Sequence, residues 1–220
     1  MSLELKKRII TSLFLFSLLT LMFFYTYILI ISLIIITIIA WIEFYALISK
    51  IFDKNNYNEK LLRFIYKSLS LFYLSFIVGL IIMVDIKFPN SRVFIIYSIL
   101  VSISSDIGGL IIGKIFKGRK LIKISPKKTI SGSIGSFAFS LMLIPFFINF
   151  IYVESIFNLA LITILISLTS QIGDLFISYL KRKAKVKDTS DLLPGHGGLL
   201  DRIDGIIFSI PMGLLLFNIY

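Results

Sequence analysis

The sequence predicts an all-α fold, a polytopic integral-membrane bundle of about seven transmembrane helices. Composition is the first reason: 57% of the 220 residues are hydrophobic and only 16% are charged, whereas soluble domains average about 45–50% and about 25%. The second reason is that the apolar residues form continuous runs of roughly 20, the length that crosses a bilayer core. The third is charge: if seven runs alternate across the membrane, all but two of the 23 lysines and arginines fall on one side.

Each of the seven runs is continuous, which excludes the alternating pattern of a membrane β-barrel. The first run follows Lys6, Lys7 and Arg8, like the core of a signal peptide. Because no small-residue cleavage site follows and the apolar character continues into the second run, we interpret it as a retained helix. In chain order the runs cover 9–25, 27–49, 67–85, 92–114, 130–152, 156–180 and 203–220.

The basic residues predict the orientation, because cytoplasmic segments carry an excess of them. Only Lys87 and Arg92 are left for the opposite face. We therefore expect a protein of the bacterial-type inner membrane with loops 115–129 and 181–202 in the cytoplasm. We expect it to divide into N-terminal helices over 1–90 and a region over 91–220, which the polar motifs described below predict to be catalytic. Membrane sidedness also accounts for the net charge of +11, so we expect no nucleic-acid partner.

Among the acids within the predicted spans, Asp174 is the most informative, because a charge at that depth is costly. It shares one helix stripe with Gln171, Ser178 and Lys181 and lies roughly 10 Å along the axis from Lys181. Such a carboxylate needs a cation, either a metal ion or a basic side chain in an interhelical ion pair. A protonated, packed aspartic acid is the further alternative.

Two other acids lie within spans. Asp106 shares a helix face with Gly109 and Gly113, a spacing of small residues that permits close helix contact. A packing seam therefore explains Asp106 as well as a binding site does. Glu43 has no polar stripe, and we interpret it as structural.

A candidate phosphate site opens the fifth run. Ser125, Lys127, Lys128 and Thr129 precede it, and the free N–H groups at a helix N-terminus attract anions. The alternative is an ordinary hydroxyl cap beside cytoplasmic lysines.

The densest polar segment runs from Ser178 to Asp204. Asp201 and Asp204 stand one turn apart at the start of the last run, where aspartate also serves as a helix cap. We expect these two acids to converge with Asp174, and oxygen ligands of this kind suit Mg²⁺. With cations nearby for phosphates, the segment predicts a metal-assisted phosphoryl or nucleotidyl transfer site.

This segment resembles the C-terminal signature of the phosphatidate cytidylyltransferases (CDP-diacylglycerol synthases). The shared pattern is S-x-apolar-K-R, four residues, K-D, and then P-G-H-G-G-apolar-x-D-R-apolar-D, and every fixed position is met. An upstream block from Gly113 to Gly132 and the pair Gly173-Asp174 are also similar to the family. Departures fall at Gly109, Leu110, Ile130, Ser131 and Ile177.

The resemblance implies a Mg²⁺-dependent enzyme of phospholipid biosynthesis that converts CTP and phosphatidate to CDP-diacylglycerol and diphosphate. It implies metal binding by Asp174 and Asp201, with Asp204 and Asp106 in support, and a second cation as a further expectation. The catalytic residues it implies are Asp174, Asp201, Lys187 and Asp188. The groups implied to bind CTP and the lipid headgroup are Ser125, Lys127, Lys128, Thr129, Ser178, Lys181, Arg182, His196, Gly197, Gly198 and Arg202.

We expect His196 to contact phosphate or ribose rather than to act as a general base, with a structural turn as the alternative. The expected partners are CTP, phosphatidate and membrane lipids, with a homodimer as the assembly. Two other functions compete: a related CTP-dependent polyprenol or lipid kinase, and a transporter whose intramembrane acids bind cations. The complete signature argues against the first, and the absence of an internal repeat argues against the second.

Overall fold

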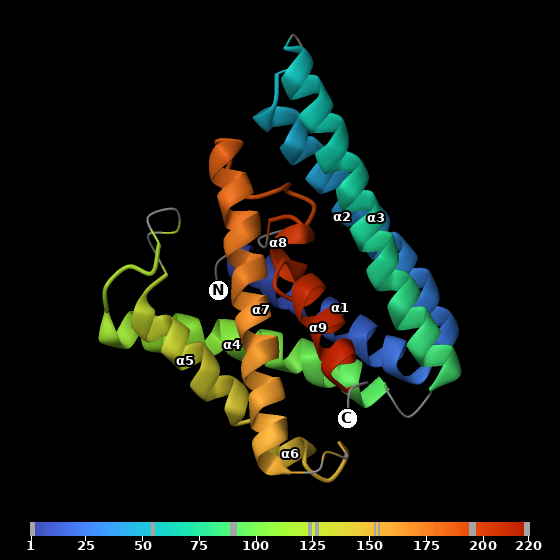
Figure 1. The fold of residues 1–220 in the computed structure, drawn as a ribbon, viewed down its shortest axis with the longest axis vertical. Helices are drawn as coiled ribbons and strands as arrows, with labels where there is room; N and C mark the ends of the chain where they lie inside the picture. The colour runs from blue at the N-terminus through green and yellow to red at the C-terminus, as the bar shows by residue number, and fades with distance from the viewer. Residues whose placement is uncertain are drawn as a thin grey trace. The chain divides into compact units, whose positions relative to one another are not determined.

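The structure is a computed structural model that describes residues 3–53, 56–88, 92–122, 125, 128–151, 153, 155–193 and 197–217. Within these ranges every secondary-structure element longer than an isolated β-bridge is a helix (Figure 1). The helices fall into two compact units. The N-terminal unit comprises Met1–Lys87 and Leu180–Ile203, and the central unit comprises Phe88–Tyr179 and Asp204–Tyr220.

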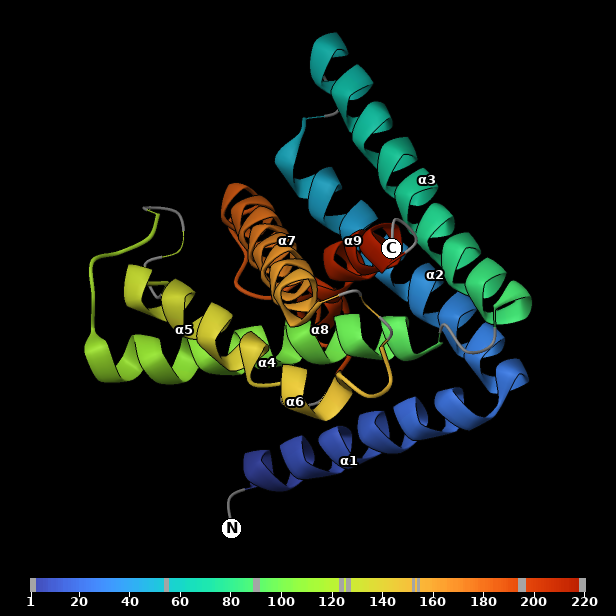
Figure 2. The same ribbon diagram turned by 60° about the horizontal axis from the view of Figure 1, so that its bottom comes forward.

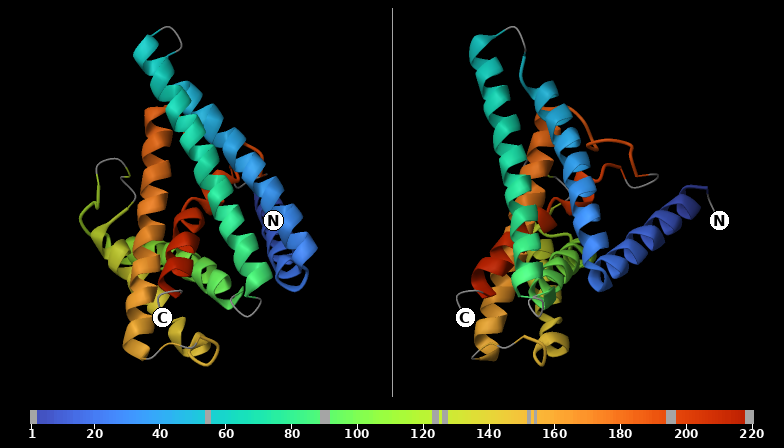
Figure 3. Two further views of the ribbon diagram at one scale, coloured as in Figure 1. Left: turned by 45° about the vertical axis from the view of Figure 1, so that its right-hand side comes forward. Right: turned by 90° about the vertical axis from the view of Figure 1, so that its right-hand side faces the viewer.

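The N-terminal unit is built on a helical hairpin. Helix α1 (Leu3–Phe24) leads into α2 (Thr26–Ile51), and α2 and α3 (Tyr57–Lys87) run antiparallel side by side (Figures 1 and 3). The indole Nε1 of Trp41 donates to the carbonyl oxygen of Lys67 at 3.3 Å, and the Lys67 ammonium lies 3.2 Å from the centre of the Tyr45 ring. The same unit contains the last turn of α7 and the short helix α8 (Leu200–Ile203).

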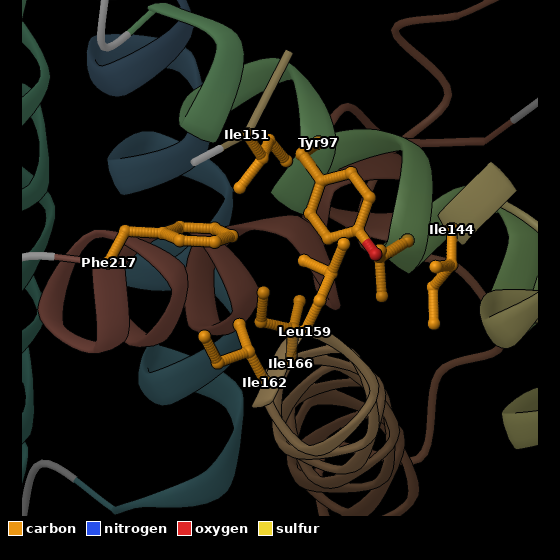
Figure 4. Close-up of a cluster of buried hydrophobic side chains, with 8 residues drawn as sticks. Tyr97, Ile144, Ile151, Leu159, Ile162, Ile166 and Phe217 are labelled. Carbon is orange, nitrogen blue, oxygen red and sulfur yellow. The ribbon is translucent and has the colours of Figure 1, made fainter. Parts of the chain in front are cut away.

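The central unit contains α4 (Arg92–Phe116), α5 (Ile130–Leu141), α6 (Ile144–Phe147), α7 (Ile156–Lys183) as far as Tyr179, and α9 (Ile206–Phe217). Its apolar core centres on Tyr97, whose ring lies among side chains from α6, α7 and α9 (Figure 4). The other fully or nearly buried members of this cluster are Val101, Ile144, Ile151, Leu159, Ile162, Ile166 and Phe217.

Buried hydroxyl groups join α4 to α7 inside this core. The hydroxyl oxygens of Tyr97 and Thr163 lie 2.5 Å apart, and those of Ser102 and Ser170 lie 2.7 Å apart. Because lipid offers no hydrogen-bond partners, small polar side chains of this kind hold membrane helices together.

Close contact of α4 with α5 depends on glycine, as the Gly109/Gly113 spacing predicts, and the two helices lie side by side in Figure 2. A Cβ at Gly109 would stand 2.7 Å from Ser136 Oγ, and one at Gly113 would stand 3.1 Å from Thr129 Oγ1. The tightest approach is between Gly108 and Gly135, where a Cβ on either residue would overlap the other helix.

Replacing Gly108 by alanine is therefore expected to destabilise the central unit by about 1–3 kcal/mol, because the new methyl group meets the Gly135 carbonyl and the Phe139 side chain. The measurement is the apparent melting temperature of the purified protein in detergent. Gly79→Ala in α3 is the matched control, since a Cβ there has nothing within 4 Å. Alanine favours a helix over glycine by about 1 kcal/mol, so the control should melt no lower than wild type. Equal melting of Gly108→Ala and wild type would contradict the close contact.

The helices confirm the predicted polytopic membrane bundle. Among the residues that the structure describes, five helical segments are long and apolar enough to cross a membrane: Thr26–Ile51, Tyr57–Lys87, Arg92–Phe116, Ile130–Phe147 and Ile156–Lys183. The apolar part of α1, Leu13–Phe24, is shorter, and α9 has 12 described residues. The count of about seven spans stays a prediction.

The fifth and seventh predicted runs are interrupted in the structure. Residues 130–152 form α5, a turn at Met142–Leu143 and the short α6, in which Pro145 occupies the first turn. Proline lacks the N–H that a continuous helix would need there. Residues 203–220 begin with a turn at Asp204–Gly205 before α9 starts.

Candidate active site

Leu180–Ile203, most of the signature segment, belongs to the N-terminal unit. Its described residues between α7 and α8, 184–193 and 197–199, are called the signature loop below. Asp201, in the first turn of α8, lies at the centre of its contacts. Lys181 Nζ donates to Asp201 Oδ1 at 2.6 Å, and the side chains of this ion pair are only 14% and 7% exposed. The backbone N–H groups of Thr189 and Gly198 donate to Asp201 Oδ2 at 2.8 and 3.1 Å.

Those contacts determine the ionisation of Asp201. Burial alone would raise its pKa, but the Lys181 ammonium and the two N–H donors outweigh burial and lower the pKa below its ordinary value. Asp201 is therefore a carboxylate at neutral pH, which is the form that binds a cation.

Glycines let the loop pack closely around Asp201. Gly197 has a φ of +83°, in the left-handed region. The Leu193 N–H donates to the Gly197 carbonyl at 2.8 Å. A Cβ on Gly198 would overlap Thr189 Oγ1. Larger residues at these two positions would open the loop.

Four other residues of the signature lie on the exposed side of this unit. Arg182, Lys187, Asp188 and Arg202 are all exposed. The cationic side chains of Arg182, Lys187 and Arg202 are therefore accessible to a soluble or headgroup anion; their roles stay predictions.

The central unit carries a second aspartate–lysine pair. After α4, described residues of the segment that leads to α5 pair with one another: Leu121 N–H donates to the Lys128 carbonyl at 2.8 Å and Ile130 N–H donates to the Arg119 carbonyl at 2.9 Å. The Lys128 ammonium forms an ion pair with the Asp174 carboxylate on α7. Their side chains are 26% and 25% exposed.

Asp174 therefore has the basic partner that its position required. Ser178 Oγ also donates to Asp174 Oδ1 at 3.3 Å, which confirms that these two residues share a stripe. Gln171, on the same stripe, accepts a hydrogen bond from Ser133 at 2.5 Å. The ion pair is compatible with both the structural and the catalytic interpretation of Asp174.

The start of α5 carries the ordinary hydroxyl cap that the sequence allowed as the alternative to a phosphate site. Thr129 is the N-cap, and its Oγ1 accepts the Gly132 N–H at 3.0 Å. The side chain of Ser125 is half-buried in the preceding turn. A phosphate site at this helix start stays a prediction.

The two remaining metal candidates differ in exposure. Asp204 is buried and accepts the N–H of Gly205 at 2.9 Å, while Asp106 is exposed on α4.

In the part of the chain that the structure describes, no three carboxylate or histidine side chains come together as a metal cluster. Asp201 belongs to one unit, and Asp106, Asp174 and Asp204 belong to the other, so their convergence stays a prediction. Lys127 and His196, with Pro194 and Gly195, lie outside the described residues.

The donor chemistry nevertheless fits Mg²⁺. This ion is usually held by one or two carboxylates together with substrate phosphates rather than by an all-protein cage. Asp174 and Asp201 each form an ion pair with a lysine ammonium group, so both carboxylates already lie beside a cation.

Sequence reasoning underrated one residue and missed another. Glu43 is 5% exposed and accepts four hydrogen bonds from the signature loop. Asp85, near the end of α3, is 3% exposed and was not among the predicted intramembrane acids. The partners of Glu43 lie more than 140 residues away in the chain, so no local pattern could reveal them.

Known proteins are similar to this chain in sequence. Residues 2–220 match the profile of the Cytidylyltransferase family. The phosphatidate cytidylyltransferase of Rickettsia typhi (strain ATCC VR-144 / Wilmington) is 41% identical over 143 residues, which cover 61% of this chain and 62% of that protein. That of Rickettsia prowazekii (strain Madrid E) is 40% identical over 151 residues, 65% of each chain. That of Bacillus subtilis (strain 168) is 39% identical over 135 residues, 58% of this chain and 48% of that one.

The matched segments thus span about half to two-thirds of the length of these curated relatives. The family profile, in contrast, covers nearly all of this chain, and the resemblance drawn from the signature is confirmed. The chain belongs to the cytidylyltransferase family.

Proposed function

We propose that this membrane protein transfers CMP from CTP to phosphatidate, forming CDP-diacylglycerol and diphosphate. The observation that carries the proposal is the folded signature loop, in which the buried Lys181–Asp201 pair and two backbone N–H groups fix one carboxylate. The relatives named phosphatidate cytidylyltransferase support the same reaction.

The reaction needs binding and charge more than a general base. A phosphate oxygen of phosphatidate attacks the α-phosphorus of CTP, and the bond from that phosphorus to the bridging oxygen of diphosphate breaks. Because the attacking group is already an anion, the protein must hold two polyanions together and stabilise the charge on the leaving diphosphate.

Cationic side chains supply that charge. In this proposal Lys128 and Lys181, with the exposed Arg182, Lys187 and Arg202, bind the triphosphate and the lipid headgroup. Lys128 and Lys181 are each held in place by an aspartate, so less side-chain freedom is lost when a phosphate binds.

The carboxylates complete the charge balance. Asp174 and Asp201 would hold Mg²⁺, which supplies Lewis-acid polarisation of the α-phosphate and neutralises the leaving diphosphate when bound. Asp201 keeps its negative charge because its pKa is lowered. Asp204 and Asp106 in support, a second cation and a homodimer remain expectations.

A labelling experiment tests the reaction and separates it from a lipid kinase. Purified protein receives phosphatidate, a polyprenol, diacylglycerol, Mg²⁺ and CTP labelled either at the α- or at the γ-phosphorus. Cytidylyl transfer puts the α label into the lipid product and the γ label into diphosphate. Entry of the γ label into lipid would favour a CTP-dependent kinase, and no labelled lipid at all would contradict both enzymes.

We also propose that the basic loops and the site face the cytoplasm, where CTP is available. The chain has no native cysteine, so single cysteines report sidedness cleanly. Cysteines introduced at Lys120 and Lys185 should resist an impermeant thiol reagent added to intact cells and react after permeabilisation. A cysteine at Asn90 should react without permeabilisation. Labelling of Lys185→Cys from outside would contradict the orientation.

A further inference from the structure

Glu43 is a carboxylate buried in the apolar helix α2, and it is saturated with hydrogen bonds. Its Oε1 accepts from Ser190 Oγ at 2.6 Å and from Leu199 N–H at 3.0 Å. Its Oε2 accepts from Thr189 Oγ1 at 2.8 Å and from Leu200 N–H at 2.8 Å. A carboxylate offers about four acceptor sites, so these donors occupy Glu43 completely.

The four donors come from the two ends of one loop. Thr189 and Ser190 precede the His-Gly-Gly part of the signature, and Leu199 and Leu200 follow it. Glu43 therefore closes the loop at its base, while the Leu193–Gly197 hydrogen bond closes an inner turn. Since all four donors to Glu43 belong to this loop, the residue acts on the loop.

Thr189 connects Glu43 to Asp201. The Thr189 hydroxyl oxygen lies 2.8 Å from Glu43 Oε2 and 3.0 Å from Asp201 Oδ2, and its N–H donates to the same Asp201 oxygen. Gly198 makes the approach possible, because a Cβ there would stand 2.6 Å from Glu43 Oε2. A change at Glu43 is thus transmitted to Asp201 through one shared side chain.

We propose that Glu43 is a positioning residue, which fixes the loop from Thr189 to Leu200 and, through Thr189, the carboxylate of Asp201. A buried charge is costly unless it is paired or hydrogen-bonded, and here the loop supplies all the compensation. Helix α2 then contributes to the site through this loop. The kinetic part of this inference rests on the proposed function; the structural part does not.

The test compares Glu43→Gln, Glu43→Asp and the control Glu59→Gln. Glu59 belongs to the same unit, and its carboxylate accepts one backbone N–H, that of Asp53 at 2.6 Å. Glutamine at 43 has the size of glutamate but only one acceptor oxygen, and its NH₂ group would face two donors. Aspartate keeps the charge and is one methylene shorter.

The first readout is hydrogen exchange of the backbone amides in the 189–200 peptide, measured without substrate. We expect exchange at Leu199 and Leu200 to rise at least about tenfold in Glu43→Gln, to rise less in Glu43→Asp, and to stay at the wild-type rate in Glu59→Gln. Unchanged exchange in Glu43→Gln would overturn the inference. A uniform rise throughout the protein would also overturn it, because that result indicates general destabilisation.

The second readout is steady-state transfer from CTP. We expect kcat to fall at least about tenfold in Glu43→Gln, with partial recovery in Glu43→Asp. In the double variant with Thr189→Val the losses should be less than additive, because both substitutions break one connection. Additive losses would refute transmission through Thr189. An inactive wild type would count against the proposed function alone, since the exchange measurement needs no substrate.

Discussion

Replacing Asp174 by asparagine is expected to lower the turnover number for cytidylyl transfer by at least about 10³-fold. Asparagine keeps the size of the side chain but removes the charge that balances Lys128 and would hold Mg²⁺. Asp201→Asn should cause a loss of similar size. The measurement is CDP-diacylglycerol formation at saturating CTP and ordinary Mg²⁺, with protein amounts matched after purification from membranes.

The control for this prediction is Asp191→Asn. Asp191 is an exposed acid of the same loop, and it has no role in the proposed site, so its substitution should leave turnover close to wild type. Near-normal turnover of Asp174→Asn would show that this residue is no metal ligand. The Lys128–Asp174 pair would then be the interhelical ion pair that the sequence allowed as an alternative.

Replacing Lys181 by methionine is expected to reduce both stability and activity. Methionine fills similar space but leaves the Asp201 carboxylate, whose side chain is 7% exposed, without its cation. Removing one partner of a buried pair costs about 3 kcal/mol. Because Lys181 is also proposed to bind phosphate, kcat/KM for CTP should fall about 100-fold or more.

The matched comparison is Lys128→Met, in the pair whose side chains are about a quarter exposed. Solvent screening reduces its stability cost to about 1 kcal/mol or less, while its activity loss should resemble that of Lys181→Met. Lys181→Arg should restore stability more than activity, since arginine keeps the charge but changes the geometry. The free energy of unfolding, measured by detergent titration, and steady-state kinetics check both effects. Equal stability of Lys181→Met and wild type would contradict the buried pair.

Local patterns predicted the features that depend on nearby residues. Apolar runs located the helices, the spacing of Gly109 and Gly113 predicted close contact, and Thr129 was recognised as a possible helix cap. Each of these depends on residues within a few turns of one another. The break of the fifth run near Pro145 was missed because the run was located by its apolar residues alone. The N–H that proline lacks for a continuous helix was not considered.

The site was predicted in its residues but not in its contacts. The signature identified Lys181 and Asp201, yet their pairing required the loop to fold back over 20 residues. The pairing of Lys128 with Asp174 joins a loop to a helix 46 residues later. Pairings of this kind depend on tertiary structure, and no periodic pattern in a single sequence reveals them.

The distance between Glu43 and its donors has a consequence for the order in which the chain is made. All four donors belong to residues 189–200, so they are synthesised long after α2 has formed. Until then the ribosome-bound chain carries Glu43 without the four donors that satisfy its carboxyl group in the finished protein. A chain that ends before residue 189 keeps this defect permanently. A truncated product therefore keeps a buried acid without its hydrogen-bond partners, which is costly, and Glu43 distinguishes the incomplete chain from the finished protein.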